Sequence, residues 1–465
     1  MDTKELKSKL FYESKHICNT TEGKVIEKAD EFCEPYKDFL QKAKTEREIC
    51  DLAEIKAKEA GFTEFDKNKS YFPGDKVYLK NRGKSLMLCV FGSNSLENGV
   101  KISAAHIDSP RIDLKPSPIY EDSQIALFKT HYYGGIKKYQ WTTIPLSLHG
   151  KIIREDLSEI DINIGEDKDD PQFVITDLLP HLGQEQMKRK LSEGIKGEEL
   201  NIVIGSRPLN VDEEETELVK LNILKILNEK YDITEKDFLR AELCLVPAFE
   251  VRDIGFDRSM IGGYGHDDRV CAYPALEAIL HLENPEYTCI TMLADKEEIG
   301  SDGNTGMKSL FMYYFIDEIA KENGLSAGEV LSKSTCLSAD VNSAFDPTFP
   351  DVMEKKNSSY INRGIVITKY TGGGGKSGTS DASAEYMGYV INIFDKNEVR
   401  WQTGELGKVD LGGGGTVAKY IANLNVDVVD VGVPVLSMHS PFEVVSKLDV
   451  YMAFRGFYEY FKAEK

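Results

Sequence analysis

The chain has 465 residues, of which 29% are charged and 41% are hydrophobic. This balance supports a packed core and argues against wholesale disorder. Acidic residues outnumber basic ones by 77 to 57, which gives a net charge of −20. A field of that sign repels phosphate backbones and anionic lipid, so we expect neither nucleic acid nor a membrane surface as a partner. The length allows about three domains, or two large ones.

Cysteine usage and the amino terminus predict a cytoplasmic protein. The eight cysteines are sparse for this length and form no CxxC pair, so neither a zinc ribbon nor a thioredoxin-type redox pair is encoded. Several lie in apolar runs such as Leu88–Val90. We therefore expect buried free thiols and a reducing compartment. The first residues are charged and lack an apolar core, so we expect no signal peptide, and no uncharged apolar run reaches the ~18 residues of a membrane span.

The first half of the chain begins with predicted helix and continues with predicted strands. Residues 22–60 are rich in Glu, Lys and Ala at helical spacing and predict helix that ends near Gly61. The runs Leu86–Phe91 and Val100–Ala105 predict two strands joined by a turn, similar to a hairpin. From Leu114 to Leu239, short β-like pieces alternate with acidic loops. Two acidic clusters are interpreted as solvated surface, namely Glu166–Asp170 and Asp212–Glu217.

After residue 240, strand-like and helical runs alternate. The first of these runs are Leu243–Phe249, Val270–Leu282, Thr288–Ala294 and Met307–Asn323. Alternation of this kind predicts an α/β sheet with helices on its faces. The early strands have nothing to pack on unless they join that sheet. We therefore predict one discontinuous α/β domain, residues 1–111 and 241–465, interrupted by a β-rich insertion at residues 112–240.

Five short segments carry carboxylates or imidazoles just after apolar strand-like runs. They are Ala105–Pro110, Gly265–Arg269, Ala294–Gly300, Ser338–Asn342 and Ser437–Pro441. In an open α/β sheet, ligands bind in the crevice beyond the carboxyl ends of the strands. Each segment alone has an ordinary structural explanation, such as a surface imidazole, a helix cap or a turn. Five such ends in one predicted sheet favour a shared site.

The residue types of these segments fit a centre of two divalent metal ions. Two such ions ~3.5–4 Å apart repel each other and need a shared ligand, and Asp267 is the candidate because a carboxylate can bridge through its two oxygens. His106 and Asp340 could complete the shell of one ion, and Glu298 and His439 that of the other. Imidazole nitrogen together with carboxylate oxygen suits zinc, with cobalt or manganese as alternatives.

Two further carboxylates complete the predicted centre. Glu297, next to a ligand, could act as the general base for a bridging water. Asp108, two residues after His106, could hold that imidazole by its other nitrogen. The same segments thus supply ligands, a base and an orienting group.

The five segments resemble, in order, the pattern of the aspartyl aminopeptidase family, the eighteenth family of metallopeptidases. That pattern runs HxDSP, DD or DN before a helix, EE(I/V)GS after a strand, SADxxxA and (A/S)MHS. Here it reads His106–Pro110, Asp267-Asp268, Glu297–Ser301, Ser338–Asp340 and Ser437–Ser440. The Tyr133–Gly135 stretch with Trp141, and the ending Phe454–Glu459, also fit. The resemblance, to bacterial-type members, covers most of the chain.

The resemblance implies an aminopeptidase that removes the first residue, with a preference for Asp or Glu, from peptides with a free amino terminus. It implies a co-catalytic pair of zinc ions bridged by Asp267, with Glu297 as the base and Asp108 as the orienting residue. The implied metal ligands are His106, Asp267, Glu298, Asp340 and His439.

The resemblance also implies a fold and an assembly. The fold would be a phosphorylase/peptidase-like three-layer α/β/α catalytic domain, with a cis peptide bond after Asp267. The β-rich insertion would be a dimerisation domain. Its dimers would assemble into a homo-oligomeric dodecamer.

Two stretches depart from the family pattern. Family members often carry a second His four residues after a Pro-His-Leu, whereas Pro180-His181-Leu182 is followed here by Glu185 at that spacing. The familiar QRYATD-like stretch is replaced by Lys376–Asp381. The preference for acidic amino-terminal residues therefore need not transfer.

Two glycine-rich stretches invite other interpretations. Gly372–Ser377 resembles a phosphate-cradling loop, but Tyr370 stands where that motif needs its first Gly, so we favour a flexible loop over a nucleotide site. Gly412–Gly415 precede a predicted helix whose amide hydrogens could bind a peptide carbonyl or carboxylate.

Two rival functions stay open at this point. One is another di-metal hydrolase of the same architecture, such as a dipeptidase, carboxypeptidase or deacylase. The other is a non-catalytic shell or cargo-binding assembly protein. The presence of Glu297 beside Glu298 argues against the shell, because such a protein has no need of a base.

Overall fold

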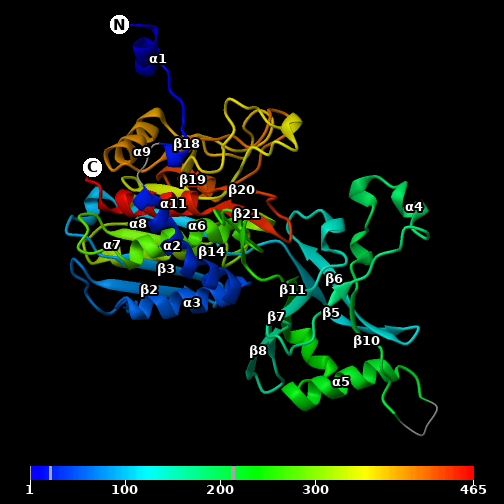
Figure 1. Ribbon diagram of the computed structural model, residues 1–465. Helices are drawn as coiled ribbons and strands as arrows, with labels where there is room; N and C mark the ends of the chain where they lie inside the picture. Colours follow the sequence, from blue (N-terminus) through cyan, green and yellow to red (C-terminus); the bar gives the residue numbers. More distant parts are fainter. Residues whose placement is uncertain (1, 20–22, 211–214, 465) are drawn as a thin grey trace.

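The computed structural model describes residues 2–19, 23–210 and 215–464. Figure 1 shows a large body and a smaller one that extends from its side. The large body is built on a mixed sheet, with the strand order β1-β2-β3-β14-β4-β15-β19-β17-β18 among the described residues. Its strands are β1 (Thr63–Glu64), β2 (Lys76–Asn81), β3 (Ser85–Val90), β4 (Lys101–His106), β14 (Cys289–Ala294), β15 (Thr335–Ala339), β17 (Ile365–Thr368), β18 (Trp401–Thr403) and β19 (Asp427–Gly432).

Strand β14 lies between β3 and β4. It pairs antiparallel with β3 and parallel with β4, and β4 pairs parallel with β15. The predicted hairpin of the two early strands is therefore wrong, because a strand from much later in the chain separates them. The early strands do join the later sheet, as expected. The parallel neighbours β14, β4 and β15 end at the same edge, so the residues that follow them meet there.

Helices cover both faces of this sheet. Alternate side chains of a strand point to opposite faces, and Leu88 and Cys89 of β3 accordingly belong to two different hydrophobic clusters. One cluster includes residues of α2 (Gly23–Lys42), α3 (Glu46–Glu59), α6 (His266–Leu280), α9 (Ala384–Lys396) and α11 (Lys447–Lys462). The other includes residues of α7 (Phe311–Lys321), α8 (Ala327–Leu331) and α10 (Ala418–Ala422).

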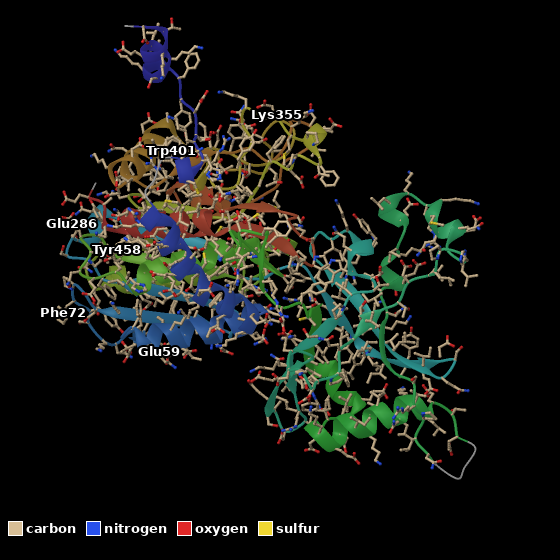
Figure 2. All side chains as sticks on the ribbon, viewed as in Figure 1. Glu59, Phe72, Glu286, Lys355, Trp401 and Tyr458 are labelled. Atoms are coloured by element: carbon tan, nitrogen blue, oxygen red, sulfur yellow. The ribbon has the colours of Figure 1, made fainter. Side chains whose placement is uncertain are left out.

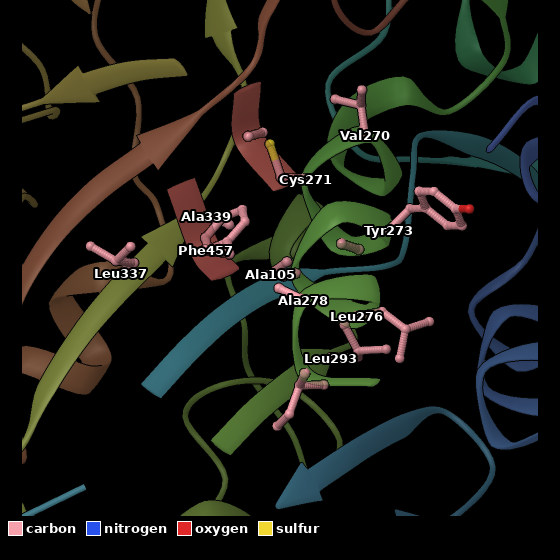
Figure 3. Close-up of a cluster of buried hydrophobic side chains, with 14 of the residues drawn as sticks. Ala105, Val270, Cys271, Tyr273, Leu276, Ala278, Leu293, Leu337, Ala339 and Phe457 are labelled. Carbon is pink, nitrogen blue, oxygen red and sulfur yellow. The ribbon is translucent and has the colours of Figure 1, made fainter. Parts of the chain in front are cut away.

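Helix α6 is the central element of the first cluster. All of its residues are buried. Figure 3 shows its side chains Ala278 and Leu276 beside Ala105 of β4 and Leu293 of β14. The helix is therefore fixed against the strands whose ends carry the candidate ligands.

The helix predicted over residues 22–60 is two helices, α2 and α3, of which the described part begins at Gly23. Thr45 caps the start of α3: its side chain accepts a hydrogen bond from the Glu48 N–H, and the Glu48 side chain accepts one from the Thr45 N–H. This reciprocal capping starts a new helix and turns the chain. Lys44 lies in the corner and is buried.

The smaller body is an antiparallel sheet with the order β8-β7-β11-β5-β6-β10-β9. Its strands are β5 (Arg111–Asp122), β6 (Ile125–Tyr133), β7 (Leu146–Ile153), β8 (Glu159–Ile164), β9 (Val174–Ile175), β10 (Ile202–Gly205) and β11 (Ala241–Pro247). Helix α5 (Leu218–Tyr231) packs against it, and α4 (Gln184–Met187) lies farther out (Figure 1). The domain division at residues 111 and 240 stays a prediction, although hydrogen bonding places β11 in this second sheet.

A buried ionic contact joins the two bodies. The Lys44 ammonium lies 2.7 Å from Glu166 and donates to the Pro247 carbonyl at 2.8 Å. His149 Nε2 lies 3.1 Å from the same Glu166 carboxylate. The expectation that the cluster Glu166–Asp170 is solvated surface is thus wrong for Glu166, whose side chain is only 16% exposed. In the other cluster, residues 212–214 lie outside the described residues.

A third, small sheet has the order β12-β13-β21-β20-β16. Its strands are β12 (Arg252–Ile254), β13 (Met260–Gly263), β16 (Asn342–Ser343), β20 (Pro434–Leu436) and β21 (Glu443–Ser446). Two of the five candidate segments follow strands of this sheet, so it completes the site.

Large apolar side chains are exposed at several places on the surface, among them Phe72 and Leu182. Figure 2 shows Glu59 and Phe72 on the outside of the large body, and the described part of the chain before α2 includes α1 (Thr3–Leu10), which has no buried residue. All eight cysteines are free; seven are buried and Cys18 is exposed. Among the helices of the described residues, none has both the length and the apolar character needed to cross a bilayer.

Candidate metal centre

The five predicted ligands converge from two sheets. His106 ends β4, Asp340 follows β15 and Glu298 follows β14, so these three stand at one edge of the large sheet. Asp267 follows β13 at the start of α6, and His439 follows β20. The expectation that all five strand ends belong to one sheet is therefore wrong, because the small sheet supplies two of them.

Asp267 lies between the two histidines. Its Oδ1 is 3.1 Å from His106 Nε2, and its Oδ2 is 3.2 Å from His439 Nε2. Asp340 Oδ1 lies 3.9 Å from His106 Nε2, and Glu298 Oε2 lies 3.4 Å from His439 Nε2. Two groups of three residues that share Asp267 thus present ligand atoms within 4.8 Å of one another.

Both histidines present the same nitrogen to the centre. His439 Nδ1 lies 2.7 Å from the carbonyl oxygen of Gly135, and His106 Nδ1 lies 3.0 Å from that of Asp108. A carbonyl oxygen only accepts, so each Nδ1 carries a proton and each Nε2 faces Asp267. Gly135 follows β6, so the second sheet helps to orient a ligand.

The buried carboxylate of Asp108 connects a ligand with the segment of the predicted base. Its Oδ1 lies 3.3 Å from His106 Nδ1 and accepts the backbone N–H of Glu297 at 3.0 Å. Its Oδ2 accepts the backbone N–H of Glu298 at 3.2 Å and the Tyr133 hydroxyl at 2.8 Å. One side chain therefore holds the main chain of two neighbouring functional residues.

Sequence reasoning missed Glu443. This buried carboxylate accepts the backbone N–H of Asp267 at 3.0 Å and that of His439 at 2.8 Å. The Ser109 hydroxyl donates to the Asp267 carbonyl at 2.6 Å, so both main-chain polar groups of Asp267 are held. Burial, with the charge of Asp267, raises the pKa of Glu443 to about 8. The one signal in the sequence is its position four residues after His439.

The chain enters the centre through an unusual local backbone. The peptide bond between Asp267 and Asp268 is cis, as the resemblance implies. At Gly265, where φ is +78°, a Cβ would lie 2.2 Å from the Arg269 guanidinium, so only glycine fits. His266 faces away from the centre, with Nδ1 2.7 Å from the Tyr36 hydroxyl.

The carboxylates of the centre are buried beside like charges. Burial and neighbouring carboxylates raise the pKa of Glu298 and of Asp340 well above their usual range, and that of Glu297 to about 7. Burial also acts on Asp267, but the two histidines outweigh it and hold the Asp267 pKa well below its usual range. Among the described residues, Oε1 of Glu298 is buried without a hydrogen-bond partner. Two imidazoles and three carboxylates, one of which has an oxygen without a hydrogen-bond partner, are a set of ligands that fits divalent metal ions such as zinc.

A cavity of about 450 Å³ opens on this centre. Its walls include Glu297, Gly413–Gly415 and the buried Asp430. Lys419 is the one lysine or arginine among the described residues that line it. The ammonium of Lys419 lies 4.8 Å from the centroid of the Tyr420 ring.

Two other sequence features lie outside the centre. In the loop Gly372–Ser377, the Lys376 ammonium pairs with Asp381 at 2.8 Å and lies over the Tyr370 ring. The next helix begins only at Ala384, so the loop lacks the helix start of a phosphate-cradling motif. His181 is exposed and belongs to neither ligand group.

Known proteins resemble this chain over nearly its whole length. The family described as "Aminopeptidase I zinc metalloprotease (M18)" matches residues 39–461. The "Probable M18 family aminopeptidase 1" of Clostridium acetobutylicum is 48% identical over 456 residues, which are 96% of this chain and 98% of that protein. The crystal structure of an M18 aminopeptidase from Thermotoga maritima has a TM-score of 0.93 at 44% identity and covers 97% of this chain and 100% of its own. Aminopeptidase I from Clostridium acetobutylicum has the same TM-score and identity, with 98% and 100% covered.

An α/β fold with a mixed central sheet, a second antiparallel sheet and a buried histidine–carboxylate centre define a metal-dependent peptidase. The chain belongs to the M18 family of zinc metalloproteases and is a metalloaminopeptidase, a hydrolase.

Proposed function

We propose that this enzyme removes single residues from the free amino terminus of peptides through two divalent ions, zinc in the first place, with cobalt or manganese as alternatives. The observation that carries the proposal is Asp267, whose two oxygens face His106 and His439 at 3.1 and 3.2 Å. A carboxylate in that position is suited to bridge two ions. Asp340 would complete the ligands of the ion at His106, and Glu298 those of the ion at His439.

The chain's own residues would position and move the protons of the reaction. When bound, the ions would supply Lewis-acid polarisation of the scissile carbonyl and of water. The Glu297 carboxylate would take a proton from the attacking water and return it to the leaving amine. Asp108 would hold the Glu297 main chain in place and keep His106 in the tautomer whose Nε2 faces the centre.

We propose further that the first residue of the substrate is preferentially Asp or Glu. Lys419 supports this preference, because it is the one lysine or arginine among the described residues of the cavity wall and could pair with a carboxylate side chain. The Gly413–Gly415 segment in the same wall has no side chains and leaves room for the substrate backbone.

A panel of peptides that differ only in the first residue tests both proposals. Apo protein is reconstituted with zinc, cobalt or manganese, and each peptide is offered with a free and with an acetylated amino terminus. We expect stepwise release of first residues from free peptides, fastest for Asp and Glu, and no release from blocked ones. Cleavage of blocked peptides would favour a carboxypeptidase or deacylase. Bound metal well below two ions per chain, without turnover, would favour a non-catalytic shell.

We propose that the insertion, residues 112–240, forms dimers that assemble into a dodecamer. The mApe1 structure of S. cerevisiae, described as a dodecamer, shares the fold with a TM-score of 0.74 at 20% identity. The insertion also exposes a run of large apolar side chains, a composition typical of contact surfaces. They are Leu178, Leu179, Leu182, Met187 and Leu191. Light scattering tests the assembly, and a monomeric mass would contradict it. A cytoplasmic location stays a prediction, supported by the buried free thiols.

A further inference from the structure

We infer that Glu443 is a positioning residue that sets the spacing between two ligands of the proposed metal centre, on which this inference rests. Its Oε2 accepts the backbone N–H of Asp267 at 3.0 Å, and its Oε1 accepts that of His439 at 2.8 Å. The two oxygens belong to one rigid carboxylate. The main chains of the bridging ligand and of a terminal ligand are therefore held at a fixed distance from each other.

The position of Glu443 in the small sheet explains why it can reach both segments. Strand β21 pairs antiparallel with β13, and Glu443 stands opposite Gly263, four residues before Asp267. On its other side, the chain turns back through Ser440, whose N–H donates to the Ser437 carbonyl and so closes the turn that presents His439. The Glu443 side chain is 1% exposed, so water cannot replace either hydrogen bond.

The arrangement repeats what Asp108 does for the segment of the predicted base. Asp108 accepts the N–H groups of Glu297 and Glu298, whereas Glu443 accepts those of Asp267 and His439. Two buried acceptors thus hold four functional residues, which lie in three segments, by their main chains. Pre-organised ligands bind metal more tightly, because they lose less conformational entropy on binding. Groups that orient ligands typically contribute 10–100-fold to the metal affinity.

The substitution Glu443→Gln, compared with a control, distinguishes a role in positioning the ligands from a general contribution of a buried carboxylate to stability. A glutamine side chain keeps one acceptor oxygen but turns an NH₂ donor toward the other backbone N–H. The matched control is Asp449→Asn in α11. Asp449 is equally buried and accepts the backbone N–H groups of Asn362 and Gly364 at 2.6 and 2.7 Å, but it touches no candidate ligand.

The experiment is a zinc competition with a chromophoric chelator on the full-length protein, with the unfolding midpoint of the apo protein measured in parallel. We expect Glu443→Gln to weaken zinc binding about 10–100-fold and Asp449→Asn to leave it unchanged, although both lower the unfolding midpoint. Excess zinc should restore most of kcat in Glu443→Gln. If Glu443→Gln does not fold, Glu443→Asp, which withdraws the carboxylate by one methylene, carries the test with a smaller expected loss.

Wild-type zinc affinity in the folded Glu443 variant, or equal losses in the Glu443 and Asp449 variants, would overturn the inference while leaving the metal centre intact. Failure of the wild-type protein to bind zinc would instead overturn the metal centre itself. The two failures are therefore distinguishable.

Discussion

The carboxylate of Asp108 accepts the backbone N–H of Glu297 at 3.0 Å, although the two residues follow different strands of the large sheet. The same carboxylate lies beside His106. The predicted base and a predicted ligand are thus held by one buried group. We therefore expect a substitution at either residue to disturb the position of the other.

We expect Glu297→Gln to retain bound zinc and to lose about 10²–10⁴-fold in kcat, because the amide cannot carry the proton. Steady-state kinetics and elemental analysis on the same sample measure both effects. The neighbouring change Glu298→Gln is the control and should lower the zinc content instead. Wild-type turnover in Glu297→Gln would remove that residue from the mechanism.

Asp108→Asn should weaken zinc binding about 10–100-fold. The amide NH₂ of asparagine would face groups that donate hydrogen bonds to the Asp108 carboxylate in the wild type, and two donors cannot pair. Tyr133→Phe removes only one of those donors and should have a smaller effect. Calorimetric titration of zinc into apo protein compares the two variants. Equal affinities in Asp108→Asn and wild type would show that His106 is oriented by main-chain contacts alone.

Lys419→Met should lower kcat/KM for peptides beginning with Asp or Glu by about tenfold or more, since a charge-assisted hydrogen bond contributes about 1.5–3 kcal/mol. Peptides beginning with Leu should be cleaved at the wild-type rate. Lys376→Met, which removes a lysine already paired with Asp381, serves as the control. A uniform loss on all substrates would assign Lys419 a structural role.

Glu166→Gln should destabilise the protein by about 3 kcal/mol near neutral pH, because it leaves the buried Lys44 without its charged partner. Burial disfavours the charge of Glu166, but His149 and Lys44 outweigh it and lower the Glu166 pKa to about 2. A lowered pKa gives stability that is present above pH 4.5 and is lost as pH falls toward 2. The difference between variant and wild type should therefore shrink over that range.

Denaturant unfolding at several pH values measures this difference. Glu185→Gln is the matched control, because its ion pair with Lys188 is exposed and should contribute little. A Glu166 effect that does not depend on pH would contradict the ionic explanation.

The candidate ligands were predictable because each follows an apolar strand in a short segment of characteristic residue types. His106, Asp267, Glu298, Asp340 and His439 therefore come together as expected, together with the cis bond after Asp267. Pairing between strands was not predictable, since β14 enters between β3 and β4 from far along the chain. The small sheet, whose strands precede Asp267 and His439, was not predicted for the same reason, because its strands also pair across long stretches of the chain.

Residues that act through the main chain were hardest to predict. Glu443 has no pattern of its own and gains its role only when Asp267 and His439 are neighbours in space. Glu166 stands in an acidic run typical of surface, and only the corner made by Lys44 and Thr45 brings a buried cation to it.

The five candidate metal ligands are spread along the chain, from His106 to His439. During synthesis, the first ligands leave the ribosome long before the last ones exist. A nascent chain therefore carries an incomplete set of candidate ligands until His439 has been synthesised.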